Sequence, residues 1–112
     1  MRFIGRVPIA QLDHGAMVRL ADPPFDALVA IVQEVPCAIE DACNHGGASL
    51  SEGERRGSCV SCPMHGYVFD LSSGQLVSPR GLCGPQRRLV ARREGTDVVV
   101  LDPGPPVALL GG

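Results

Sequence analysis

The sequence predicts an all-β protein whose antiparallel strands form a barrel or packed sheets, and three observations favour this fold class. Of the 112 residues, 14 are glycine and 10 are proline, two residue types that destabilise helix interiors. Short apolar or β-branched runs recur at close spacing, with turn sequences such as Asp13-His-Gly15 between them. Apolar residues make up 45% of the chain, which is enough for the core of one domain and argues against disorder.

Nine runs have the length and composition of strands. In chain order they cover residues 2–6, 16–20, 27–32, 36–40, 58–61, 68–71, 75–77, 88–91 and 97–101. Residues 98–101 are apolar on both faces, as expected of a central strand, and Glu94-Gly95 predicts a hairpin between the last two runs. Only residues 8–12 are expected to form a helical turn, and the proline-rich residues 103–112 are expected to form an extended tail.

Composition and charge also limit the compartment and the kinds of partner. No apolar run approaches the roughly 18 residues that a membrane-spanning helix needs, so we expect no membrane span. The N-terminal sequence lacks an export signal, which predicts a cytoplasmic protein. The net charge of -2 favours neither nucleic acid nor an anionic membrane as a partner. Five cysteines, an odd number without an export signal, indicate metal binding rather than a disulfide framework.

Two short motifs in the middle of the chain carry the chemistry. Cys43-Asn-His45 is followed, after 16 residues, by Cys62-Pro-Met-His65, and glycine follows each histidine. Neighbouring strand residues point to opposite faces, so a cysteine and a histidine two or three apart reach one cofactor only if the backbone curls. Glycine permits this curl and lets backbone N–H groups approach the cofactor. Two such loops facing each other would offer two thiolates on one side and two imidazoles on the other, the ligand set of a two-iron cluster.

The sequence around these motifs resembles the Rieske iron–sulfur proteins. Residues 42–53 and 60–74 are similar to the two family signatures, and the flanking segments extend the likeness over residues 1–102. The resemblance implies a β-sandwich base into which a small cluster-binding subdomain, at about residues 41–84, is inserted. It also implies one [2Fe-2S] cluster with four protein ligands, which are Cys43, His45, Cys62 and His65.

Compared with the respiratory and photosynthetic members, the chain has fewer features that raise the reduction potential. Those members carry an extra cysteine in each loop, and the two form a disulfide, whereas Ala48 and Met64 stand at the corresponding positions here. They also place a serine and a tyrosine beyond the second histidine to donate hydrogen bonds to the cluster sulfurs, where this chain has Tyr67 and Phe69. Because fewer donors stabilise the added electron less, the resemblance is to the soluble, low-potential ferredoxins.

Alternative interpretations of these residues remain open from the sequence. Four nitrogen and sulfur ligands could hold one tetrahedral zinc in a non-redox interaction module, although structural zinc sites seldom mix Cys and His within each loop. Cys59 has Cys-x-x-Cys spacing with Cys62, but we interpret it as a strand residue beside a ligand. Cys37 and Cys83 are interpreted as small buried hydrophobes, so none of these three additional cysteines is expected to be a ligand or disulfide partner. His14 is interpreted as a solvated turn residue.

The expected function is that of a ferredoxin rather than an enzyme. It would carry one electron from a flavin-dependent reductase to a terminal oxygenase. The alternative is the small Rieske subunit of a larger reductase, such as an assimilatory nitrite reductase. We expect a monomer that docks through an apolar tip formed by Pro63, Met64, Tyr67, Leu82 and Pro85. An arginine cluster is interpreted as an exposed strand face paired with acids of the first half of the chain, with a docking surface as the alternative; it comprises Arg80, Arg87, Arg88, Arg92 and Arg93.

Overall fold

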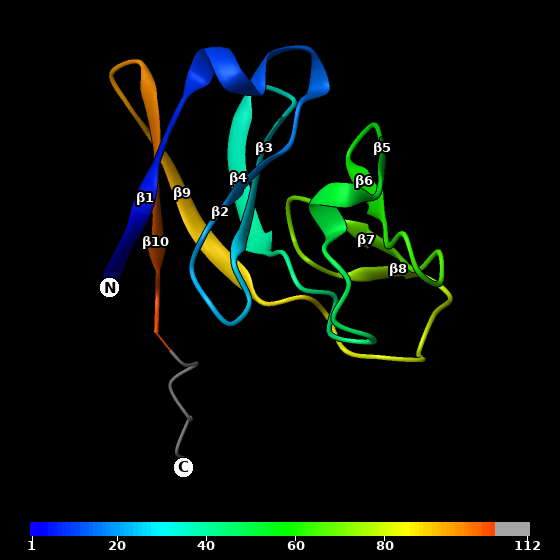
Figure 1. Cartoon of the computed structure of the whole chain (residues 1–112). Coiled ribbons are helices and arrows are strands. Elements are labelled where there is room, and N and C mark those ends of the chain that lie inside the picture. Colours follow the sequence, from blue (N-terminus) through cyan, green and yellow to red (C-terminus); the bar gives the residue numbers. More distant parts are fainter. Residues whose placement is uncertain (105–112) are drawn as a thin grey trace, which may run out of the picture.

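The computed structural model describes residues 1–104, which form two antiparallel sheets (Figure 1). The larger sheet has six strands in the order β1-β10-β9-β4-β3-β2. Its strands are β1 (Arg2–Pro8), β2 (Val18–Leu20), β3 (Ala27–Val32), β4 (Val35–Glu40), β9 (Arg88–Glu94) and β10 (Asp97–Asp102). The smaller sheet follows the chain order, with β5 (Glu54–Arg56), β6 (Cys59–Ser61), β7 (Val68–Asp70) and β8 (Leu76–Ser78). The all-β, antiparallel prediction is confirmed.

The six-stranded sheet curls so that its two edge strands face each other. A Cβ atom added to Gly5 of β1 would lie 3.3 Å from a methyl carbon of Leu20 on β2. The enclosed space holds one core cluster, and the 3-10 helix η1 (Ile9–Gly15) adds Leu12 to it. Of the residues predicted to form a central strand, Val98 and Val100 are fully buried in this cluster. This cluster contains no residue of the two Cys and His motifs. The six-stranded sheet therefore has a hydrophobic core of its own.

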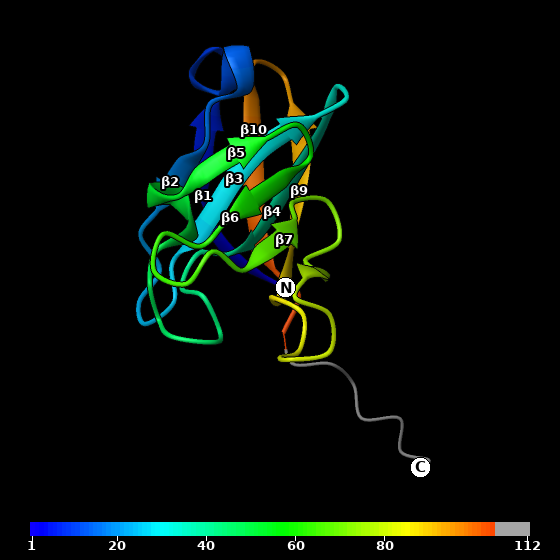
Figure 2. The same cartoon turned by 90° about the vertical axis from the view of Figure 1, so that its right-hand side faces the viewer.

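The small sheet packs against the outer face of β3 and β4, as Figure 2 shows in front view. Strand β3 is therefore apolar on both faces: Leu28 and Ala30 face the small sheet, whereas Ala27 and Val29 face the enclosed core. Arg55 of β5 adds a polar link, since its guanidinium donates a 2.7 Å hydrogen bond to the carbonyl of Ile31. A second core cluster thus joins the two sheets and ends at the two motif cysteines.

The strand predictions differ from the structure mainly in the small sheet. Strand β5 was not expected, because Glu54–Arg56 is a charged run without strand composition; it forms by pairing with β6, and Gly57 makes the turn at a φ of +60°. Strand β9 extends to Glu94, so the hairpin turn lies at residues 95–96, one residue later than predicted. The expected helical turn is a 3-10 helix. Of the predicted tail, residues 105–112 lie outside the described residues.

No helical segment within residues 1–104 has the length and apolar character needed to cross a membrane.

Candidate metal centre

Two loops with matching hydrogen bonds carry the motif residues. In the first loop, which follows β4, the N–H of Cys43 donates to the carbonyl of Ala48 at 2.7 Å, and the carbonyl of Cys43 accepts from Gly47 at 2.7 Å. The second loop lies between β6 and β7 and has the same two hydrogen bonds. The N–H of Cys62 donates to the carbonyl of Tyr67 at 2.7 Å, and the carbonyl of Cys62 accepts from the N–H of Gly66 at 2.9 Å. The two glycines have φ values of +80° and +71°, which side-chain-bearing residues rarely adopt. The curl that the sequence predicted is therefore present twice.

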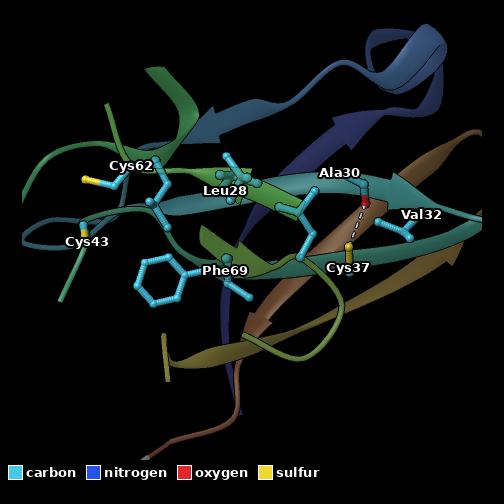
Figure 3. Packing of buried hydrophobic residues seen from close by; sticks show 11 residues of the cluster. Leu28, Ala30, Val32, Cys37, Cys43, Cys62 and Phe69 are labelled. Atoms are coloured by element: carbon cyan, nitrogen blue, oxygen red, sulfur yellow. Dashed lines mark hydrogen bonds between the residues drawn. The ribbon is translucent and has the colours of Figure 1, made fainter. Parts of the chain in front are cut away.

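The two loops bring the four predicted site residues together in two layers. Cys43 and Cys62 are each 2% exposed and form one end of the core cluster between the sheets (Figure 3). His45 and His65 lie at the surface, with their ring centroids 4.9 Å apart and the rings nearly perpendicular at 82°. The cysteine side of the site is thus buried from solvent, whereas the histidine side is exposed to it.

The local environment of the cysteines is suited to binding metal through sulfur. Burial is the largest influence on the pKa of the Cys43 thiol and raises it above its usual value, and the adjacent Cys62 thiol acts in the same direction. The backbone N–H groups of His45 and Gly46 act in the opposite direction, because they donate toward the Cys43 sulfur and stabilise a thiolate. A cationic metal would supply the remaining stabilisation, since metal binding deprotonates a ligating thiol.

The donor set fits a two-iron cluster better than a single ion. A tetrahedral zinc needs four donors around one point, whereas each iron of a Rieske cluster takes only two protein ligands. The arrangement of two buried sulfurs behind two exposed imidazoles therefore fits the binuclear centre.

A third segment, which sequence reasoning missed, fixes the first loop. The side chain of Gln86 is 2% exposed, and its Oε1 accepts a 2.7 Å hydrogen bond from the N–H of Asn44. Its Nε2 donates to the carbonyls of Glu40 and Ala42, both at 2.8 Å. In return, the amide of Asn44 donates to the carbonyls of Gly84 and Pro85. No signal in the sequence pointed to Gln86, because a glutamine beside two arginines is typical of exposed segments.

Two aspartates fix turns near the site, Asp41 in the first loop and Asp70 in the turn that follows β7. Asp41 is 1% exposed and accepts a 2.7 Å hydrogen bond from the N–H of Ser51, which closes the first loop on its far side. Asp70, at the end of β7, accepts hydrogen bonds from Ser72 and from the N–H of Ser73. Burial alone would raise the pKa of Asp70, but these hydrogen bonds outweigh it and hold the pKa below the usual value. The first loop and the turn after β7 are thus fixed by protein groups alone.

Tyr67 stacks on a histidine of the opposite loop. Its ring lies 4.1 Å from that of His45, centroid to centroid, with an interplanar angle of 17°. The distance to the ring of His65, which is nearer in sequence, is 6.4 Å. The sequence places Tyr67 at a family hydrogen-bond position and in the apolar tip, and neither interpretation predicts this contact.

Four of the five residues predicted to form an apolar tip are exposed. Met64 and Leu82 are each 65% exposed, and Pro63 and Pro85 are exposed as well, while Tyr67 is half-buried by its packing. These apolar side chains are contributed by the second motif and by the segment before Gln86.

Two further residue predictions need correction or detail. Cys37 is buried as expected, and its thiol lies 3.5 Å from the carbonyl of Ala30, but Cys83 is only half-buried. Of the arginines predicted to pair with acids of the first half of the chain, Arg87 pairs with Glu40 as predicted but also with Asp102, and Arg92 pairs with Glu94 instead. All five cysteines, each within residues 1–104, have free thiols.

Comparisons with known proteins agree with this geometry. The model of the Rieske [2Fe-2S] domain family matches residues 7–90. The 3-phenylpropionate/cinnamic acid dioxygenase ferredoxin subunit of Shigella boydii is 32% identical over 105 residues, covering 89% of this chain and 93% of that protein. The corresponding subunit of Escherichia coli K12 is 36% identical over 78 residues, covering 69% and 73%.

Solved structures give the same result for the fold. A chain of the complex of reduced oxygenase and oxidised ferredoxin in carbazole 1,9a-dioxygenase has a TM-score of 0.80 and 27% identity, with 88% of this chain and 92% of that chain covered. The ferredoxin of carbazole 1,9a-dioxygenase from Nocardioides aromaticivorans IC177 has a TM-score of 0.79 and 22% identity, with 91% and 99% covered.

The fold and the paired loops define a small electron-transfer protein of the iron–sulfur class. The chain belongs to the Rieske [2Fe-2S] domain family. Its cofactor is one [2Fe-2S] cluster, and it acts as a ferredoxin, an electron carrier rather than an enzyme.

Proposed function

We propose that four side chains hold the cluster, with Cys43 and Cys62 on one iron and His45 and His65 on the other. The observation that carries this assignment is the pairing of two buried cysteines with two exposed histidines on loops that share one hydrogen-bond pattern. Each iron then receives two protein ligands of one kind, as a mixed-ligand cluster requires. Residues 41–84, which include both loops and the small sheet, form the cluster-binding unit in this proposal.

The chain itself performs two tasks around the cofactor, whose chemistry is to gain and lose one electron. The apolar cluster around Cys43 and Cys62 excludes water from the sulfur side, whereas the exposed rings of His45 and His65 provide the side from which electrons enter and leave. With Phe69 rather than a hydroxyl-bearing residue buried in this core, fewer donors stabilise the added negative charge. The reduction potential should therefore lie toward the low end of the roughly -150 to +300 mV Rieske range.

The electron donor is proposed to be a flavin-dependent reductase and the acceptor a terminal oxygenase. Two findings support this role: relatives are named as ferredoxin subunits of dioxygenases, and a similar chain occurs in a complex of an oxygenase with a ferredoxin. Five free thiols suit a reducing compartment, which favours the cytoplasm. Partners would dock at the apolar side chains around the imidazoles, because redox encounters are small and must dissociate quickly.

The substitution Met64→Glu tests the docking site. A carboxylate at this 65% exposed position should leave the visible spectrum intact but slow electron transfer to the oxygenase, because contact would desolvate the new charge. Val35→Glu is the matched control, since Val35 is 61% exposed and lies at the opposite end of β4 from the first loop. Stopped-flow mixing of reduced ferredoxin with oxidised oxygenase gives the rates. Equal rates for the wild type and Met64→Glu would mean that partners dock elsewhere.

Charge steering is tested separately with Arg88→Gln. Arg88 is exposed, whereas Arg87 is engaged with Asp102 and Glu40 and is unsuitable for this purpose. The variant should reduce the salt dependence of association while leaving the rate at high salt unchanged. An identical salt dependence in both proteins would exclude a steering role for this arginine.

A further inference from the structure

Tyr67 connects the two loops of the site through an aromatic stack. Its backbone carbonyl accepts a 2.7 Å hydrogen bond from the N–H of Cys62, and its side chain packs against the core cluster between the sheets. The ring is thus anchored on the second loop. It nevertheless stacks, at 4.1 Å and 17°, on His45 of the first loop. Such near-parallel stacking restricts rotation of the imidazole about its own axis.

The two histidines therefore have unequal surroundings. Ala48 occupies the position in the first loop that Tyr67 occupies in the second, because its carbonyl accepts the hydrogen bond from the N–H of Cys43. Alanine has no aromatic ring that could stack on His65. The first loop instead approaches His65 with Gly46, where an added Cβ would lie 3.6 Å from the Cε1 of that histidine. Among residues 1–104, His45 has a stacked aromatic neighbour, whereas His65 has only edge contacts with other rings.

We propose that Tyr67 is a positioning residue that fixes the ring of His45 and lowers the reduction potential of the cluster; this rests on the ligand assignment proposed above. An iron-bound imidazole is more electron-poor when the cluster is oxidised. The face of a phenol ring carries partial negative charge and attracts an electron-poor ring more strongly. The stack therefore stabilises the oxidised state more than the reduced state.

Shielding from water acts in the same direction. The phenol ring covers one face of an otherwise exposed imidazole. Water dipoles at that face would stabilise the negative charge that reduction adds, so their exclusion disfavours reduction. Both effects predict that removal of the ring raises the potential.

The test compares Tyr67→Leu with Tyr67→Phe. Leucine keeps apolar bulk but removes the stacked ring, so its reduction potential in voltammetry should shift upward and the g-values of its reduced EPR spectrum should change. Phenylalanine keeps the ring and loses only the hydroxyl, so its potential should equal that of the wild type. Iron content and melting temperature, measured for each variant, separate this effect from general destabilisation.

Two results would overturn the proposal. One is a Tyr67→Leu protein with full iron content whose potential and EPR spectrum match the wild type, or whose potential falls. The other is a Tyr67→Phe protein that shifts as much as Tyr67→Leu, since the hydroxyl rather than the stack would then act. If Tyr67→Leu loses iron, Tyr67→Met is measured by the same criteria. Failure of the ligand assignment would be visible differently, as a wild-type protein without a mixed-ligand spectrum.

Discussion

The side-chain oxygen of Gln86 lies 2.7 Å from the backbone nitrogen of Asn44, the residue between Cys43 and His45. The same amide group also donates to the carbonyls of Glu40 and Ala42, so one buried side chain satisfies two backbone groups of the first loop and one at the end of β4. The buried side chain of Gln86 thus holds the first loop in place through hydrogen bonds to its backbone.

Substitution of this glutamine should loosen the first loop. Gln86→Leu leaves three backbone groups without partners, and we expect a loss of at least about 3 kcal/mol in the free energy of unfolding, because each such group costs about 1–3 kcal/mol. Loss of iron to a chelator should be faster for the same reason. Gln75→Leu, at an exposed position, is the matched control and should behave like the wild type. Urea unfolding and chelation kinetics check both effects, and wild-type behaviour of Gln86→Leu would show that the contacts do not hold the loop.

The ion pairs of Asp102 predict a pH-dependent contribution to stability. Arg87, the N–H of Gly104 and Arg2 hydrogen-bond to this carboxylate, so the pKa of Asp102 is held well below its usual value. A lowered folded-state pKa stabilises the fold above the unfolded-state pKa, about 3.9, and this contribution is lost as the pH falls further. Asp102→Asn should cost about 1–2 kcal/mol at pH 7. The difference from the wild type should shrink below about pH 4; a gap in urea-derived stability that is constant with pH would contradict this.

A hydroxyl introduced into the core behind the cysteines should raise the reduction potential. Phe69 is fully buried in the cluster that ends at Cys43 and Cys62, and Phe69→Tyr supplies a donor there. A donor to cluster sulfur stabilises the added negative charge, so voltammetry should give a higher potential than for the wild type. A wild-type potential near the top of the roughly -150 to +300 mV range would show that the absence of donors is not decisive.

The remaining cysteines should be dispensable for cofactor binding. Burial raises the pKa of Cys37 to about 11, so its thiol stays protonated near neutral pH and unreactive. A protein with Cys37→Ser, Cys59→Ser and Cys83→Ser should be less stable by about 1–3 kcal/mol, because a hydroxyl replaces a buried thiol. It should still hold two iron atoms per chain. Iron loss in this variant, or a disulfide between any of these residues in non-reducing mass spectrometry of the wild type, would contradict the prediction.

The sequence allowed prediction of what depends on local pattern. The turn glycines and the Cys and His spacing predicted the curled loops, and the apolar run at residues 98–101 predicted a central strand. Tertiary contacts could not be predicted in this way. The charged residues of β5 form a strand only because they pair with β6. Gln86 is buried where its side chain hydrogen-bonds to three backbone groups that are distant in sequence. The stack of Tyr67 on His45 likewise depends on how two loops face each other.

Pulsed EPR of the reduced protein tests the mixed Cys and His ligation most directly. The assignment of Cys43, His45, Cys62 and His65 predicts a paramagnetic two-iron centre coupled to imidazole nitrogens. The signal should disappear in Cys43→Ser and in Cys62→Ser, because either change removes a sulfur ligand. A colourless protein without a signal would indicate zinc, and an iron signal without nitrogen coupling would indicate ligation by cysteine alone; either result would contradict the proposed centre.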